Sequence, residues 1–144
     1  MQFNLILIIK MVFFFFTSEL ENKLQSQKER ERIIGVWVMI KSEKDGKPRF
    51  DESIGEKYTY AYKKNGDFIL DFRIVRNQVE DADMSIMDYP KIKWSIVNKN
   101  IEYKAFDSNG RFLGVTSDFF YFSGDTLVTG NAVLTSYYLK ISEK

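Results

Sequence analysis

The sequence predicts an all-β fold in which eight antiparallel strands form a closed up-and-down barrel. Two observations support this prediction: short segments alternate apolar and polar residues, and turn residues recur between them. A third is the composition, because 16% of the residues are aromatic and only two are proline, which suits half-buried strands. The 144 residues match the length of one domain of ordinary size.

Alternation is clearest in residues 67–74 and 91–96, where apolar side chains occupy every second position. Residues 57–63 and 101–106 follow the same pattern. The residues that share one face in these four segments are Tyr58, Tyr60 and Tyr62; Phe68, Leu70, Phe72 and Ile74; Ile92, Trp94 and Ile96; and Ile101, Tyr103 and Ala105. Four further segments complete eight strands: residues 34–42, 111–122, 126–129 and 132–141. The last of these places Val133, Thr135, Tyr137, Leu139 and Ile141 on a common side.

Turn signals separate these segments, among them Asp45-Gly46, Asn65-Gly66 and Asn109-Gly110. Such dipeptides favour tight hairpins because both residues accept positive φ. Eight short strands in meander order favour a barrel over a sandwich, because closure removes the exposed strand edges. The interior of an eight-stranded barrel is either filled by side chains or holds one small ligand, and both alternatives stay open here.

The longest stretch without such a turn signal, Val75–Pro90, is expected to be a long loop or an edge strand with a bulge. It contains Glu80, Asp81 and Asp83, whose oxygens could ligate calcium. Their spacing lacks the glycine and the terminal glutamate of an EF-hand loop. We therefore expect a solvated acidic loop and no metal site.

Residues 3–16 form an apolar run interrupted by Asn4 and Lys10, shorter than the roughly 20 residues of a membrane-spanning helix. We interpret residues 1–26 as a signal peptide or leader, and expect a secreted or periplasmic protein. The alternative is an N-terminal helix that packs on the folded domain. Residues 19–32 are strongly charged and are expected to form a solvated helix or a linker, with 27–32 leading into the barrel domain at 33–144. Contact with a membrane is expected only through an uncleaved leader.

The composition also restricts function. The chain has no histidine or cysteine, which excludes thiol nucleophiles, Ser-His-Asp relays, histidine or thiolate metal sites and disulfides. A formal net charge of +1 provides no large positive potential to attract the phosphates of nucleic acid, so nucleic acid is not expected as a partner. No residue set suggests catalysis and no cofactor is expected, so a binding protein is favoured over an enzyme. The oligomeric state is left open.

The segment Gly35-Val36-Trp37 resembles the glycine-any-tryptophan signature of lipocalins, and residues 33–141 look like a divergent bacterial secreted lipocalin-like domain. Residues 60–68 resemble that family's second hairpin, residues 93–100 its central tryptophan strand, and residues 137–140 its closing strand. The resemblance implies a calycin-type barrel in which Gly35 and Trp37 close one end. It also implies that Lys140 stands in place of the arginine that covers the tryptophan. Thr116-Ser117-Asp118-Phe119 is only a loose counterpart of the threonine-aspartate-tyrosine motif.

We expect a small hydrophobic ligand inside the barrel, on a surface of aromatic rings whose hydroxyl groups orient it. The candidate binding residues are Tyr58, Tyr60, Tyr62, Phe68, Phe72, Trp94 and Tyr103. The same residues could instead form a packed core or an outer stripe. In that case the chain would be a closed-barrel interaction or structural module without a small-molecule ligand.

Overall fold

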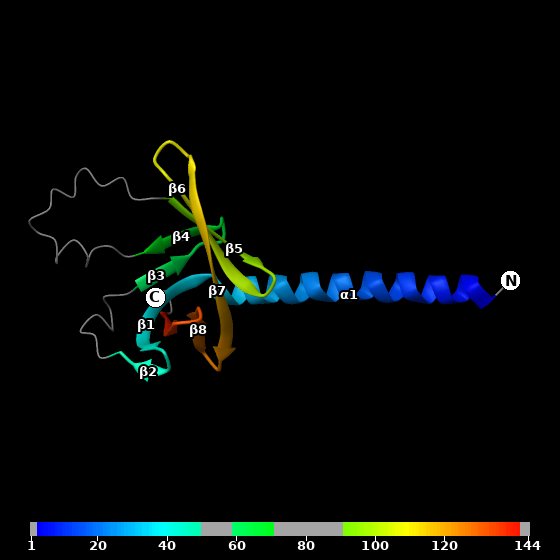
Figure 1. Cartoon of the computed structure of the whole chain (residues 1–144), viewed down its shortest axis with the longest axis horizontal. Helices are drawn as coiled ribbons and strands as arrows, with labels where there is room; N and C mark the ends of the chain where they lie inside the picture. The colour runs from blue at the N-terminus through cyan, green and yellow to red at the C-terminus, as the bar shows by residue number, and fades with distance from the viewer. Residues whose placement is uncertain (1–2, 50–58, 71–90, 142–144) are drawn as a thin grey trace, which may run out of the picture. The chain divides into compact units, whose positions relative to one another are not determined.

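The computed structural model describes residues 3–49, 59–70 and 91–141, with side chains from residue 17 onward. Within these residues, nine strands form one antiparallel sheet that closes on itself (Figure 1). The strands are β1 (Gly35–Lys44), β2 (Lys47–Pro48), β3 (Thr59–Tyr62), β4 (Asp67–Leu70), β5 (Lys91–Val97), β6 (Asn100–Phe106), β7 (Phe112–Ser123), β8 (Thr126–Gly130) and β9 (Leu134–Ile141). The predicted all-β fold, with an eight-stranded up-and-down antiparallel barrel, is confirmed.

The barrel closes through the pairing of its first and last strands. β1 and β9 pair from Val36 opposite Ile141 to Lys44 opposite Leu134, with a bulge between Met39 and Lys41. All other neighbouring strands also pair antiparallel, in chain order from β3 to β9. Closure therefore gives the apolar strands partners on both sides, which is the physical reason for preferring a barrel to an open sheet.

The extra strand, β2, follows the Asp45-Gly46 turn and pairs with the end of β1. Both turn residues have positive φ, 51° for Asp45 and 72° for Gly46, as a tight hairpin turn requires. Asn65-Gly66, Asn109-Gly110 and Gly124-Asp125 also lie between consecutive strands. The turn residues thus mark hairpins at the expected places.

Strand register shows which face of each strand lines the barrel. Tyr62 pairs with Gly35 and Phe68, and Trp94 pairs with Tyr103, so these side chains share the inner face. On β9 the inner face holds Ser136 and Tyr138, while Leu139 and Ile141 are 43–45% exposed. Val133, directly before the strand, is 49% exposed. The common side predicted for residues 132–141 is therefore the outer side of the barrel.

The N-terminal region is one helix, α1 (Phe3–Ile33), of 31 residues. Met1–Arg32 form one compact unit and Ile33–Lys144 the other. The charged segment after residue 19, for which helix and linker were both open, is helical, and residues 27–32 belong to α1. Arg30 and Arg32 lie in the last turn, where positive charge complements the helix dipole. Across the described part of the chain, no helix combines the length and the apolar character needed to cross a membrane.

Two predictions lie outside the described residues. The loop Val75–Pro90 with its three carboxylates is one. The other is the extension of the strands at 57–63 and 67–74 to Tyr58 and Phe72.

Candidate functional site: a tyrosine-lined pocket in the barrel

Inward-facing side chains of seven strands enclose a partly open pocket of about 230 Å³, which we call the tyrosine pocket. Its lining residues are Tyr60 and Tyr62 of β3, Phe68 of β4, Ile92 of β5, Tyr103 of β6, Thr116 and Asp118 of β7, Thr129 of β8 and Tyr138 of β9. The rings come mainly from β3, β4 and β6, whereas β7 and β8 contribute shorter side chains. Space remains because short residues on one wall face rings on the other.

The aromatic side chains of the pocket pack on one another. The rings of Tyr60 and Phe68 are stacked, with centroids 5.7 Å apart. The ring centroid of Phe68 also lies 4.9 Å from that of Tyr103 and 4.8 Å from that of Tyr62. These mutual contacts hold the wall in one arrangement, since ring pairs at such distances attract beyond their buried area.

Two hydroxyl groups meet inside this aromatic wall. The Tyr62 and Tyr103 hydroxyl oxygens are 2.7 Å apart and share a hydrogen bond. Burial raises the pKa of both phenols well above the usual range, with nearby charge adding to the shift. Both groups are therefore neutral hydrogen-bonding groups at ordinary pH.

The pocket also contains the phenol of Tyr138, whose ring centroid lies 5.4 Å from that of Tyr60, and the carboxyl group of Asp118. Burial raises the pKa of Tyr138, while hydrogen bonds with Ser136 and Thr129 oppose the shift. Burial is also the cause that raises the pKa of the half-buried Asp118 above the usual aspartate range. Among the lining side chains that the structure describes, Asp118 is the single acidic residue.

Next to the pocket, the barrel is filled by large side chains that we call the packed cluster: Ile33, Trp37, Trp94, Ile101 and Leu127, each at most 3% exposed. The cluster lies towards the end of the barrel where β1 begins and where β5 turns into β6. The indole N–H of Trp37 donates to the Ile33 carbonyl oxygen at 2.7 Å, so its polar atom is satisfied although buried. Among the described residues, this part of the interior is therefore occupied by tightly buried side chains.

Gly35 and Lys140 lie beside Trp37. The Lys140 ammonium nitrogen is 5.4 Å from the centroid of the Trp37 ring, within reach of a cation–π attraction. A Cβ at Gly35 would collide with the Lys140 side chain, and the φ of 142° at Gly35 disfavours other residues. Glycine at this position therefore leaves space for the lysine over the tryptophan.

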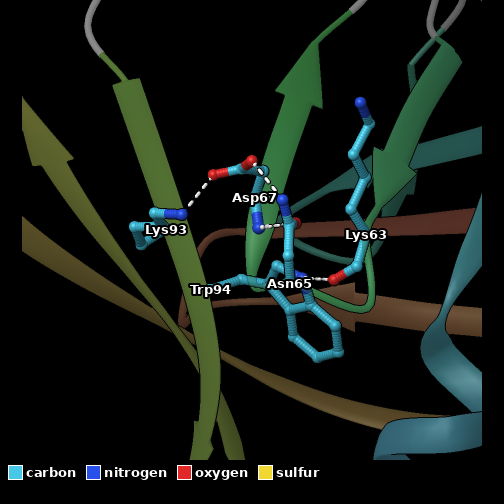
Figure 2. Close-up of polar contacts among 5 residues, drawn as sticks. All are labelled: Lys63, Asn65, Asp67, Lys93 and Trp94. Carbon is cyan, nitrogen blue, oxygen red and sulfur yellow. Dashed lines mark hydrogen bonds and ion pairs between the residues drawn. The ribbon is translucent and has the colours of Figure 1, made fainter.

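The β3–β4 turn holds Trp94 in the packed cluster (Figure 2). The Trp94 indole N–H donates to the carbonyl oxygen of Lys63 at 3.0 Å, and its backbone N–H donates to Gly66 at 2.8 Å. Asn65 shapes the turn by donating to the Asp67 carboxylate at 2.8 Å and accepting from its backbone N–H at 3.0 Å. Asp67 also pairs with Lys93, which together with Asn65 lowers the pKa of its carboxyl group.

The structure places the predicted binding residues in three groups. Tyr60, Tyr62, Phe68 and Tyr103 lie together in the tyrosine pocket. Trp94 lies in the packed cluster and is not among the lining residues. Tyr58 and Phe72 lie outside the described residues.

Five lining residues were missed at the level of sequence: Ile92, Thr116, Asp118, Thr129 and Tyr138. The alternation puts Ile92 on the same face as Trp94 and Ile96, but Ile92 was not among the predicted binding residues. The alternation of residues 111–122 places Thr116 and Asp118 on one face, but it cannot tell which face is inward. Only the pairing of β7 with β6 puts Thr116 opposite Tyr103 and Asp118 opposite Ile101.

Comparison with known proteins gives no relative: no family model matches the chain, and neither a curated protein nor a solved structure matches it.

Proposed function

We propose that this protein is a lipocalin-like binding protein that holds a small, mainly hydrophobic ligand in the tyrosine pocket. The observation that carries the proposal is the pocket itself, about 230 Å³ of space bounded by rings inside a closed barrel. Ligand sites are typically concave, mainly apolar and provided with a few polar groups, and pockets for drug-sized ligands measure about 300–1,000 Å³. The ligand is therefore compact.

The lipocalin-like part of the proposal is supported by the neighbourhood of Trp37. A closed up-and-down barrel begins with Gly35-Val36-Trp37, and Lys140 lies over the tryptophan ring. That combination agrees with the sequence resemblance. We further propose that residues 1–26 direct export, so that the barrel acts as a secreted or periplasmic binder rather than an enzyme.

Saturable binding of a small neutral aromatic molecule tests the proposal. tert-Butylbenzene, titrated into the full chain, should change the intrinsic tyrosine fluorescence and reach saturation. A pocket-filling variant, Thr116→Trp, should abolish this binding, because Thr116 lines the pocket from β7.

Ser117→Trp is the matched control, since Ser117 is the next residue of the same strand and points to the opposite face. It adds the same indole ring outside the barrel and should leave binding intact. The proposal is wrong if the wild-type protein shows saturable binding neither of this probe nor of a charged molecule of the same shape, or if Thr116→Trp binds as the wild type does.

A second candidate function is a closed-barrel interaction module without a small ligand. The outer face of β7 favours it, because Leu113, Val115, Phe119 and Tyr121 are 37–52% exposed along one side of the strand. Exposed apolar patches of this kind often mark protein interfaces. This candidate takes precedence if the wild-type protein binds no small aromatic molecule.

A further inference from the structure

Among the described carboxylates of the barrel, Asp118 is the one that lines the tyrosine pocket. It lies on the inner face of β7 and is half-buried. Its carboxylate forms no hydrogen bond or ion pair with the described residues. Four other barrel carboxylates each have a cation: Glu43 has Lys41, Asp67 has Lys93, Glu102 has Lys104 and Asp107 has Arg111.

The described side chains that line the pocket with Asp118 provide no positive charge. Neither lysine nor arginine is among these described lining residues. The groups that face the carboxylate are aromatic rings and hydroxyls: Tyr60 and Tyr62 from β3, Phe68 from β4, Tyr103 from β6, Tyr138 from β9, and Thr116 and Thr129. Burial is the main cause that raises the pKa values of Tyr62, Tyr103 and Tyr138, and negative charge on Asp118 adds to the shift in all three.

A carboxylate among aromatic faces is suited to one ligand chemistry in particular. Aromatic rings attract organic cations through their negative π-faces, most strongly when water is excluded. A carboxylate in the same pocket supplies the counterion, and its own cost of burial falls when a positive group arrives. An anionic ligand would be repelled by Asp118, and a neutral apolar ligand would cover the carboxylate without pairing it.

We propose that the tyrosine pocket binds a small organic cation, an ammonium group on a compact hydrophobic body, with Asp118 as its counterion. This proposal rests on the proposed function and specifies the class of ligand. A bare metal ion does not fit the described lining. Calcium takes six to eight oxygen ligands, several of them from carboxylates, and the described lining contains one carboxylate, Asp118.

Two probes of equal shape separate charge from hydrophobicity. Phenyltrimethylammonium and tert-butylbenzene differ by the exchange of a charged nitrogen for a carbon atom. Both are titrated into the full chain, with intrinsic fluorescence or calorimetry as the readout. We expect the wild-type protein to bind the cation about tenfold or more tightly than the neutral probe.

The key variant is Asp118→Asn, which retains the side-chain shape and removes the charge. It should weaken binding of the cation about tenfold or more and leave the affinity for tert-butylbenzene within about twofold. Asp125→Asn is the matched control, because it makes the same change of net charge in the exposed β7–β8 turn. It should affect neither probe.

The pH profile provides a readout independent of the variants. The ammonium group of phenyltrimethylammonium does not titrate, and the tyrosines facing Asp118 titrate only in the alkaline range. The affinity for the cation should therefore fall as pH falls through the raised pKa of Asp118. The affinity for tert-butylbenzene should stay constant over the same range. Asp118→Asn should remove this dependence.

The outcomes separate the two proposals. If the neutral probe binds as tightly as the cation, or if Asp118→Asn weakens both probes equally, the cation proposal is overturned and the binding protein stands. If neither probe binds the wild-type protein, both proposals are overturned. A large loss of cation affinity in Asp125→Asn would assign the effect to overall charge and overturn the role of Asp118.

Discussion

The packed cluster and the tyrosine pocket lie on the same inner face of one barrel, yet they treat polar groups in opposite ways. In the packed cluster, the indole N–H groups of Trp37 and Trp94 both donate to backbone carbonyl oxygens. The nearby Asp67 is paired with Lys93. In the pocket, Asp118 has no such cation among the described residues. The polar groups in and beside the packed cluster are paired by the protein itself, whereas the carboxylate of Asp118 in the pocket remains for a ligand to pair.

The two regions also differ in how much space they leave, and side-chain size explains this difference. Where Trp37, Trp94 and Ile101 meet, bulky groups from several strands fill the interior. Where Thr116 and Thr129 face the rings of β3 and β4, the interior keeps its space. Thus, the same alternation of residues produces a core or a cavity according to what stands on the opposite wall.

The largest effect is expected for Trp94→Ala. Trp94 is 3% exposed and its indole N–H donates to the β3–β4 turn, so its removal leaves a cavity and removes one of the two hydrogen bonds that the Lys63 carbonyl accepts. The free energy of unfolding should fall by about 3–5 kcal/mol, measured by urea denaturation. Ser95→Ala, one residue along β5, should change it by no more than about 0.5 kcal/mol. A loss below about 1 kcal/mol in Trp94→Ala would contradict the packed cluster.

A matched pair of isoleucines tests the boundary between the two regions. Ile101 is fully buried in the packed cluster, whereas the half-buried Ile92 faces the pocket. Ile101→Ala should reduce the free energy of unfolding by about 2–5 kcal/mol. Ile92→Ala should cost less than half of that, because its side chain already borders empty space. Equal losses in thermal or urea unfolding would show that the pocket is packed like the cluster.

The shared hydroxyl bond gives a smaller effect. Tyr62→Phe leaves the buried Tyr103 hydroxyl without its partner at 2.7 Å, and should reduce the free energy of unfolding by about 0.5–1.5 kcal/mol. The double variant Tyr62→Phe with Tyr103→Phe should lose less than the sum of the single changes. Tyr121→Phe, on the exposed outer face, serves as the control. Strict additivity would indicate that the two hydroxyls do not interact.

The smallest effects concern pH, and they have opposite signs in the two regions. The pKa of Asp67 is lowered by Lys93 and Asn65, so its stabilising contribution is present above pH about 4 and is lost as pH falls through its lowered pKa. The pKa of Asp118 is raised by burial, so its contribution turns unfavourable as pH rises from about 4 through the raised value.

The free energies of unfolding of the wild type, Asp67→Asn and Asp118→Asn, measured across pH 3–8, test both pH-dependent contributions. Relative to the wild type, Asp67→Asn should lose stability as pH rises, and Asp118→Asn should gain it. Added salt should reduce the Asp67 effect more, because that pair is partly exposed. The same sign for both variants would refute the contrast between a paired and an unpaired carboxylate.

The sequence by itself determined the strands, the turns and the architecture. Alternation in residues 91–96 and 101–106 identified β5 and β6, and the Asn65-Gly66 signal identified the β3–β4 hairpin, because both features depend on residues close together in the chain. Four of the rings expected to line the interior, those of Tyr60, Tyr62, Phe68 and Tyr103, do lie together in the tyrosine pocket.

Only the tertiary structure decided which faces point inward and what lies opposite them. On β9 both faces carry large apolar residues, and the pairing of Met39 with Tyr138 across the closure places Tyr138 inside and leaves Leu139 outside. Trp94 and Asp118 occupy similar inward positions on their strands, but neighbours distant in sequence make one a core residue and the other a pocket residue. Burial and charge pairing depend on those long-range neighbours, and local periodicity contains no information about them.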